Sequence, residues 1–210
     1  MSIRIAGLTG ATLEHTPSVC HGCVWWQSRT GGRRPDKRRW IEKAETEFGA
    51  WGTIYYDDDG RGRALGSMQY GAARLFPRAA ELPAGPPTDD AVLVTCAYLV
   101  DRSSPWVLQS LFLAAIGEAK AKGAAALEAF AYRYPEGQSD YVRFVVHRTV
   151  FPHDFLTDFG FRTVRSSGPV ELARLELGGL VPVLEGRRAK VLQALKEAFV
   201  PEPVPAPRRP

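Results

Sequence analysis

The sequence predicts an α/β (α+β) domain built around one parallel strand–helix–strand unit. Residues 92–100 form a continuous apolar run, rich in β-branched side chains and bounded by charge, which is typical of a strand buried on both faces. From Trp106 onward, apolar residues recur at the i, i+3, i+4, i+7 spacing of a helix with one buried side. Residues 124–131 indicate a second buried strand, so we expect a right-handed crossover and parallel pairing of the two strands.

Both ends of this helix carry terminal signals. Ser104 can cap the N-terminus and Pro105 fits the first turn. Lys120 and Lys122 oppose the negative end of the helix dipole, and Gly123 supplies the C-terminal stop. The N-terminus, with its unpaired N–H groups, should therefore lie beside the carboxyl end of the first strand, where it can bind an anion.

Further elements flank the central unit. We expect a helix over 39–48, a hairpin of strands 51–56 and 64–73 across the turn DDDGRGR, a connection over 82–87, a short helix over 151–159, an antiparallel pair over 161–164 and 171–177, and a last helix over 191–199.

The chain of 210 residues has room for one good-sized domain with terminal extensions. We expect an N-terminal segment over 1–39 that packs on the domain, a main domain over 40–180, a C-terminal helical segment over 181–200, and a disordered, proline-rich tail over 201–210.

Composition and charge exclude several classes of function. The formal net charge is only +4, and the basic residues cluster in GGRRPDKRR, at 187–190 and in the terminal RRP. An anionic ligand would account for these clusters, and nucleic-acid binding through GGRRPDKRR is a weaker alternative. The sequence has no apolar run of membrane-spanning length and no signal-peptide pattern, so we expect a cytoplasmic protein. GxSxG, Walker and HExxH motifs are missing, which gives hydrolase, NTPase and zinc-protease functions no support.

The three cysteines do not form a disulfide framework. Cys96 lies in the predicted central strand, where it fits as a small core residue. Cys20 and Cys23 form the motif C-H-G-C, with His15 upstream and His21 between them. The motif permits zinc but supplies only one of the two ligand pairs of a structural site, so we expect no metal. Two thiols in a tight turn, or a redox pair, are the alternatives.

Two stretches leave two interpretations open, and two further loops have one interpretation each. VWW at 24–26 is either core packing or an aromatic wall of a substrate cleft. TGGRRPDK at 30–37 is a mobile loop or an anion-facing one, and the acidic turn at 57–63 is a solvated loop rather than a calcium site. The irregular stretch over 133–147 could be a substrate lid.

The ordered series of elements resembles the GNAT-type (GCN5-related) N-acetyltransferases. FGAWGTIYYDDDGRGRALGSMQYGAARLFPRA at 48–79 is similar to the hairpin that precedes the central unit in this family, and FPHDFLTDFGFRTVRSSGPVELARLEL at 151–177 is similar to the family's last helix, GF turn and closing strands. The resemblance implies a mixed, mostly antiparallel sheet of about six or seven strands flanked by helices. It also implies transfer of an acyl group from acetyl-CoA or another acyl-CoA to an amine acceptor, on a small molecule or a protein. A homodimer is compatible with it.

The family's cofactor loop, Q/R-x-x-G-x-G/A, corresponds here to SSPWVL at 103–108, which contains no glycine. The resemblance implies coenzyme A contacts at Ala97, Tyr98, Leu99, Val100, Arg102, Ser103, Ser104, Trp106, Val107, Leu108 and Gln109. The ring of Trp106 either enters the cleft or packs into the hydrophobic layer. The missing glycines favour the alternative function, a catalytically inactive ligand-binding or protein-interaction module.

Acyl transfer needs a base for the ammonium proton and can use an acid for the departing thiolate. In many GNAT enzymes that acid is a tyrosine four residues before the GF turn, and here this position is Leu156. The nearby alternatives are His153, Asp154 and Tyr141. Glu128 is a candidate base because it lies on the second buried strand, where a carboxylate needs a partner; its alternative is a solvent-facing position at the sheet edge.

Overall fold

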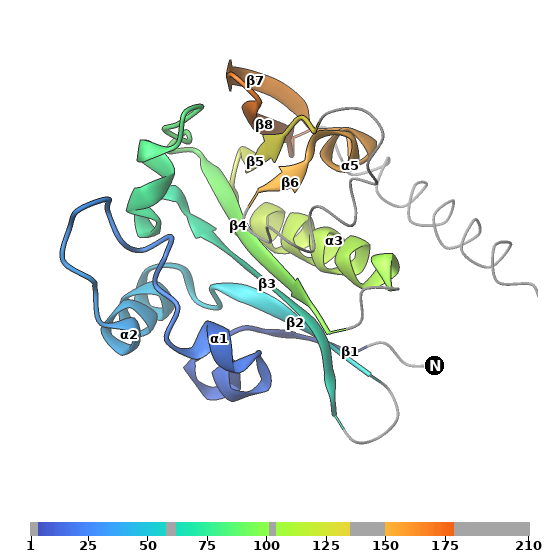
Figure 1. Cartoon of the computed structure of the whole chain (residues 1–210). Coiled ribbons are helices and arrows are strands. Elements are labelled where there is room, and N and C mark those ends of the chain that lie inside the picture. The colour runs from blue at the N-terminus through green and yellow to red at the C-terminus, as the bar shows by residue number, and fades with distance from the viewer. Residues whose placement is uncertain (1–3, 58–61, 101–103, 135–149, 179–210) are drawn as a thin grey trace, which may run out of the picture. The chain divides into compact units, whose positions relative to one another are not determined.

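The computed structural model describes residues 4–57, 62–100, 104–134 and 150–178 (Figure 1). These residues form one sheet in the order β1-β2-β3-β4-β5-β8-β7, with β6 paired to β5 beside this path. The strands are β1 (Arg4–Gly7), β2 (Gly52–Tyr56), β3 (Ala64–Ala72), β4 (Ala91–Leu99), β5 (Ala126–Tyr132), β6 (Phe151–Pro152), β7 (Arg162–Ser167) and β8 (Val170–Glu176).

The sheet is mixed and mostly antiparallel, as predicted. Among the described strands, β4 pairs in parallel with β5, and β5 with the two-residue β6. The other pairs are antiparallel. The sequence did not reveal β1 or β6, because four and two residues are too few to show an alternating pattern.

Helices cover both faces of the sheet (Figure 1). They are α1 (Ser18–His21), α2 (Lys37–Phe48), α3 (Pro105–Ala121) and α5 (His153–Asp158). The α1 and α2 helices lie on one face and α3 on the other. The α5 helix packs on α3, where Phe112 contacts the rings of Phe155 and Phe159.

The α3 helix has nearly the predicted ends. Ser104 is the N-cap residue, but its side chain makes no capping hydrogen bond, so that detail of the prediction is wrong. Gly123 has a φ of +73°, a left-handed conformation in which glycine avoids the steric penalty of a Cβ. The first turn lies close to β3, since a Cβ on Gly66 would be 2.9 Å from Cγ1 of Val107.

An apolar cluster holds α2 against the sheet. Trp40, Ile41 and Ala44 of α2 pack there with Trp51 and with Leu93 of β4. Asp36 begins the helix, and its side chain accepts a 2.9 Å hydrogen bond from the N–H of Arg39. This contact is the N-cap interaction that typically fixes the start of a helix.

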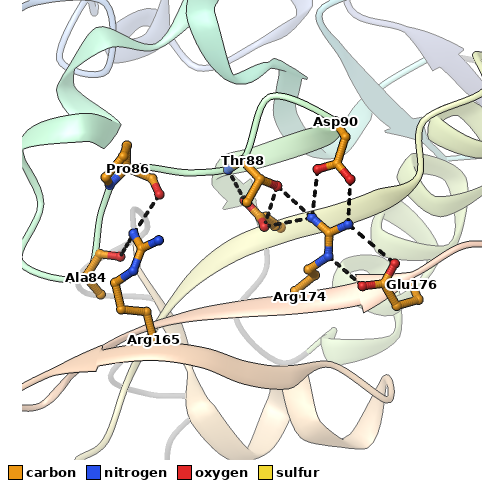
Figure 2. Close-up of polar contacts among 8 residues, drawn as sticks. Ala84, Pro86, Thr88, Asp90, Arg165, Arg174 and Glu176 are labelled. Atoms are coloured by element: carbon orange, nitrogen blue, oxygen red, sulfur yellow. Dashed lines mark hydrogen bonds and ion pairs between the residues drawn. The ribbon is translucent and has the colours of Figure 1, made fainter.

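The connection over 82–87 is irregular, as predicted, and β7 holds it in place. Nη1 of Arg165 donates to the carbonyl oxygens of Ala84 (3.1 Å) and Pro86 (2.8 Å), as Figure 2 shows. The predicted helix at 191–199, the tail, and residues 135–147 of the predicted lid lie outside the described residues. None of the helices in the described part of the chain is long and apolar enough to cross a bilayer.

Candidate functional site

The two parallel strands separate toward their carboxyl ends. Between the described residues, the β4–β5 ladder runs from Ala91↔Ala126 to Val94↔Ala129 and ends there. The β4 strand continues to Leu99, while the end of β5 pairs with β6. The separation opens beside the start of the 17-residue helix α3, whose first-turn N–H groups lack partners within the helix.

The predicted coenzyme A contacts that the structure describes lie at the end of β4 and the start of α3, and two of them, Ala97 and Tyr98, line a cavity on the α2 face. The side chains of Ala97, Leu99, Val107 and Leu108 are buried, so these residues could contact a cofactor only through the backbone. Val100 is 52% exposed at the end of β4.

Not every backbone group of the first turn is available to an anion. The N–H of Val107 donates to the carbonyl of Ser104 at 3.1 Å, and Pro105 has no N–H. Gln109 follows in the next turn, and its buried Oε1 has no hydrogen-bond partner among the described residues. Arg102 and Ser103 lie outside the described part of the chain.

The half-buried ring of Trp106, in the first turn of α3, contacts β2. Its ring lies edge-on to the ring of Tyr55 on β2, with a centroid distance of 5.3 Å and an interplanar angle of 77°. Such an aromatic pair adds roughly 0.5–1.5 kcal/mol to the free energy of burial. This geometry supports the second of the two orientations expected for the ring.

A cavity of about 220 Å³ lies on the α2 face of β3 and β4. We call it the indole cavity; its walls include Trp25, Trp26, Gln27, Lys37, Trp51, Gln69, Cys96 and Tyr98. Trp26 belongs to the core cluster, which confirms the core interpretation of the VWW motif, and it also lines this cavity, so the wall of a substrate cleft stays a prediction. A neighbouring cavity shares Thr16, Ser67 and Tyr98 with it and reaches Val100 at the end of β4.

Among the described residues, one cationic side chain lines the indole cavity. Nζ of Lys37 lies 4.6 Å from the ring centroid of Trp40 and 4.9 Å from that of Trp51. No carboxylate forms an ion pair with Lys37 in the parts of the chain described by the structure. Burial lowers the pKa of Lys37, against the opposing effect of the nearby thiols of Cys96 and Cys23.

All three cysteines line this cavity, and none is in a disulfide. Burial raises the pKa of Cys96 to about 12, so its thiol stays protonated at neutral pH and acts as a small apolar group. The described residues contain no group of three or more His, Cys, Asp or Glu side chains arranged to hold a metal ion.

A β-bulge in β4 shapes the wall of the cavity. Gln69 pairs with Cys96 and Tyr70 with Val94, so Thr95 is the extra residue. The hydroxyl of Thr95 donates to the backbone oxygen and to Oε1 of Gln69, both at 3.1 Å. These contacts, and a 3.3 Å bond from Nε2 of Gln27, fix the orientation of the Gln69 amide.

His153 contacts a buried carboxylate near the carboxyl end of β5. Its Nδ1 lies 2.7 Å from Oε2 of Glu171, which also accepts from Thr163 at 2.7 Å, while Arg133 contacts Oε1. Burial alone would raise the pKa of Glu171, but these hydrogen bonds outweigh burial and hold the pKa below its ordinary value. Asp154 is exposed on the same helix. Tyr141 lies outside the described residues.

Glu128 is fully buried, which contradicts the solvent-facing alternative. Its carboxylate accepts from the N–H of Thr88 (2.9 Å), the hydroxyl of Thr88 (2.8 Å) and Nη1 of Arg174 (3.1 Å). Arg174 also pairs with Asp90 and Glu176, which flank it in Figure 2. This network is a sufficient structural reason for the buried carboxylate, and the role of Glu128 as a base stays a prediction.

The sequence pattern does not reveal the central residues of the indole cavity. Lys37 was assigned to a polar loop, although it stands three residues before Trp40, the spacing at which a helical cation and a ring can meet. No local pattern joins Gln27, Gln69 and Cys96, because they meet only through strand pairing and the fold of the N-terminal segment.

No protein-family model matches the sequence, and no curated protein matches it. Several solved structures align with most of this chain at low identity. An N-acetyltransferase from Staphylococcus aureus Mu50 is 14% identical with a TM-score of 0.49, over 84% of this chain and 99% of its own. A protein described as GNAT-family from Desulfovibrio desulfuricans is 13% identical with a TM-score of 0.48, over 84% of this chain and 100% of its own. YncA from Salmonella typhimurium, determined with its cofactor acetyl-CoA, is 14% identical with a TM-score of 0.45, over 84% and 95%. These values assign no activity to this chain.

Proposed function

We propose that this chain is an acyl-CoA-dependent N-acyltransferase, which moves an acetyl or other acyl group to the amine of a small molecule or a protein. The observation that carries the proposal is the position of β4. Its ladder with β5 ends at Val94 beside the start of α3, and its other side lines the indole cavity at Cys96 and Tyr98. One strand therefore separates a place for an anionic cofactor from a place for an acceptor.

The residues at the separation suit an acyl-CoA. The N-terminus of α3 favours the negative charge of a pyrophosphate, and a strand edge can pair with the amide groups of an extended pantetheine arm. The acyl-CoA would supply the thioester whose carbonyl carbon the neutral amine attacks; the C–S bond breaks, coenzyme A leaves as the thiolate, and the proton lost by the amine passes to a base or to the thiolate.

His153 is the proposed proton-transfer group on the β5 side. The β6 strand pairs with Ala131 and Tyr132 at the carboxyl end of β5, and His153 follows β6 directly. Glu171 holds Nδ1 of the ring and so fixes its orientation, which is the geometry of a base positioned by a carboxylate.

Ligand binding to two charge variants tests the proposal. Pro105 and Ala121 are exposed at opposite ends of α3. Pro105→Glu places a carboxylate in the first turn, where the dipole favours it by about 0.3–1 kcal/mol, so the fold should persist. Two unit charges roughly 6 Å apart at an effective dielectric constant of about 20 repel by about 3 kcal/mol. We therefore expect acetyl-CoA binding at least about tenfold weaker by calorimetry.

Ala121→Glu is the matched control, with the same charge at the other end of the helix, and should bind acetyl-CoA like the unmodified chain. Equal weakening in both variants, or no acetyl-CoA binding by the unmodified chain at millimolar ligand, would reject the proposed site. Binding without acyl transfer to any amine would favour the inactive, ligand-binding alternative.

A further inference from the structure

We infer that the indole cavity binds a small aromatic carboxylate, and, resting on the proposed function, that the acylated acceptor is an aromatic amino acid or a similar amino-carboxylate. The charge of the cavity, its unpartnered donors and its size each support this class.

The first observation is charge. Lys37 is the only charged side chain among the described residues that line the indole cavity, and no acidic side chain is among them. A half-buried ammonium without a counter-ion is costly, and a ligand carboxylate would supply the missing charge. A ligand carrying only ammonium groups would instead face a cation in an apolar environment.

The second observation is a pair of unused donors. The indole N–H groups of Trp26 and Trp51 are buried and have no acceptor among the described residues, and both side chains are only 2% exposed. A buried N–H without an acceptor costs roughly 1–3 kcal/mol. Both indoles line the cavity, so a ligand that brings acceptor oxygens can satisfy them.

The third observation is the size and character of the walls. A cavity of about 220 Å³ exceeds the roughly 150 Å³ that accommodates a benzene molecule in a protein core. The remaining space suits a short polar arm on one ring. Trp25, Trp26 and Tyr98 supply aromatic surface, and the protonated thiol of Cys96 adds an apolar, polarisable contact.

These walls also suit the chemistry of transfer. An amine must be neutral to attack a thioester, and a cation together with apolar surroundings lowers the pKa of a bound ammonium group. The ligand carboxylate keeps the molecule in place through Lys37, while β4 brings the amine beside the separation from β5. Polycationic acceptors gain none of these contacts.

Three ligands with the same phenyl ring separate the contributions of the carboxylate and of the amine to binding. L-phenylalanine carries both groups, 3-phenylpropanoate lacks the amine, and phenethylamine lacks the carboxylate. In calorimetric titrations of the full chain without coenzyme A, the two carboxylates should bind roughly ten- to a hundredfold more tightly than phenethylamine, the range for losing one hydrogen bond to a charged group.

Two lysines of α2 supply the variant and its control. Lys37→Met keeps the apolar stem and should abolish the preference for 3-phenylpropanoate over phenethylamine. Lys43 lies on the same helix, with a side chain 58% exposed and paired with Glu47, so Lys43→Met should preserve the preference. If Lys37→Met does not fold, the three ligands on the unmodified chain decide the question alone.

Equal or tighter binding of phenethylamine, a preference that survives Lys37→Met, or no binding of either carboxylate at millimolar concentration would overturn the inference. Mass spectrometry after addition of acetyl-CoA then tests the acceptor role. Formation of N-acetylphenylalanine would support the substrate class. Binding of both carboxylates without acetyl-CoA binding would refute the proposed function while leaving the cavity's ligand class supported.

Discussion

Removing the guanidinium of Arg174 should destabilise the fold strongly, because three carboxylates depend on it. Glu128 is fully buried, whereas Asp90 and Glu176 are 54% and 70% exposed. Breaking a buried pair by removing one partner costs about 3–5 kcal/mol. Two hydrogen bonds from Thr88 remain on Glu128, so we expect the lower end of this range for Arg174→Met, about 3 kcal/mol.

The two exposed ion pairs of Arg174, with Asp90 and with Glu176, provide internal controls. Surface ion pairs contribute about 0.2–1 kcal/mol, so Asp90→Asn and Glu176→Gln should each change the free energy of unfolding by less than about 1 kcal/mol. The double change of Glu128 and Arg174 to methionine removes the buried charge as well as its partner. It should therefore cost less than Arg174→Met alone, a coupling that a double-mutant cycle measures.

Denaturant unfolding with a fluorescence readout is the assay. A loss of about 3 kcal/mol corresponds to a fall in Tm of roughly 6–12 °C for a domain of this size. A loss below about 1 kcal/mol for Arg174→Met, or a double variant less stable than the single one, would refute the reasoning.

The variant Glu128→Gln tests whether Glu128 acts as a catalytic base or only stabilises the fold. Removing a general base lowers turnover by about 10²–10⁴-fold. A structural Glu128 predicts instead that Glu128→Gln lowers stability and leaves acyl transfer per folded molecule nearly unchanged. A large loss of turnover in a variant of unchanged stability would assign Glu128 to catalysis.

Three further predictions concern other residues. Trp106→Ala should destabilise the fold by at least the roughly 0.5–1.5 kcal/mol of its aromatic contact with Tyr55, without changing acetyl-CoA affinity; stronger binding would place the ring in the cofactor's path. Because the pKa of Glu171 is lowered in the folded state, its carboxylate stabilises the fold fully above the unfolded-state pKa of about 4.3. This stabilisation is lost as the pH falls through the folded-state pKa. The free energy of unfolding of Glu171→Gln should therefore fall less steeply with decreasing pH in this acidic range than that of the unmodified chain. Replacing Cys20 and Cys23 by serine should leave the acetyl-CoA response intact, and stoichiometric zinc in the purified chain that disappears in this variant would contradict it.

The central unit was predictable because its signals are local. The apolar run of β4, the stripe of α3, and the positions of Pro105 and Gly123 each depend on residues within one element. The β1 strand was missed because pairing with β2, rather than its own four residues, makes it a strand; Ile5 is 39% exposed there, so its apolar character reveals no buried face.

The indole cavity was not predictable for a related reason. Its walls come from the N-terminal segment, α2, β3 and β4, and only pairing brings these together. The buried charge of Glu128 was a usable signal, since a carboxylate on an apolar strand needs a partner. Its partner, Arg174, lies 46 residues away and could not be identified from spacing.

One inserted residue decides which side chains of β4 face the indole cavity. Side chains alternate between the faces of a regular strand, so residues three apart should lie on opposite faces. Leu93 and Cys96 nevertheless both contact the cluster on the α2 side, because Thr95 is bulged between them. Because of the bulge, Leu93 in the first half of β4 packs in the core, and Cys96 and Tyr98 in the second half line the cavity on the same side. The bulge lies directly after Val94, where the pairing with β5 ends. The side chains of β4 therefore change face at the position where the strand loses its parallel partner. The proposed cofactor and acceptor sites therefore meet at one irregularity of β4. The signals of the strand and the helix could place the first site, whereas the bulge, which depends on pairing with β3, hid the second.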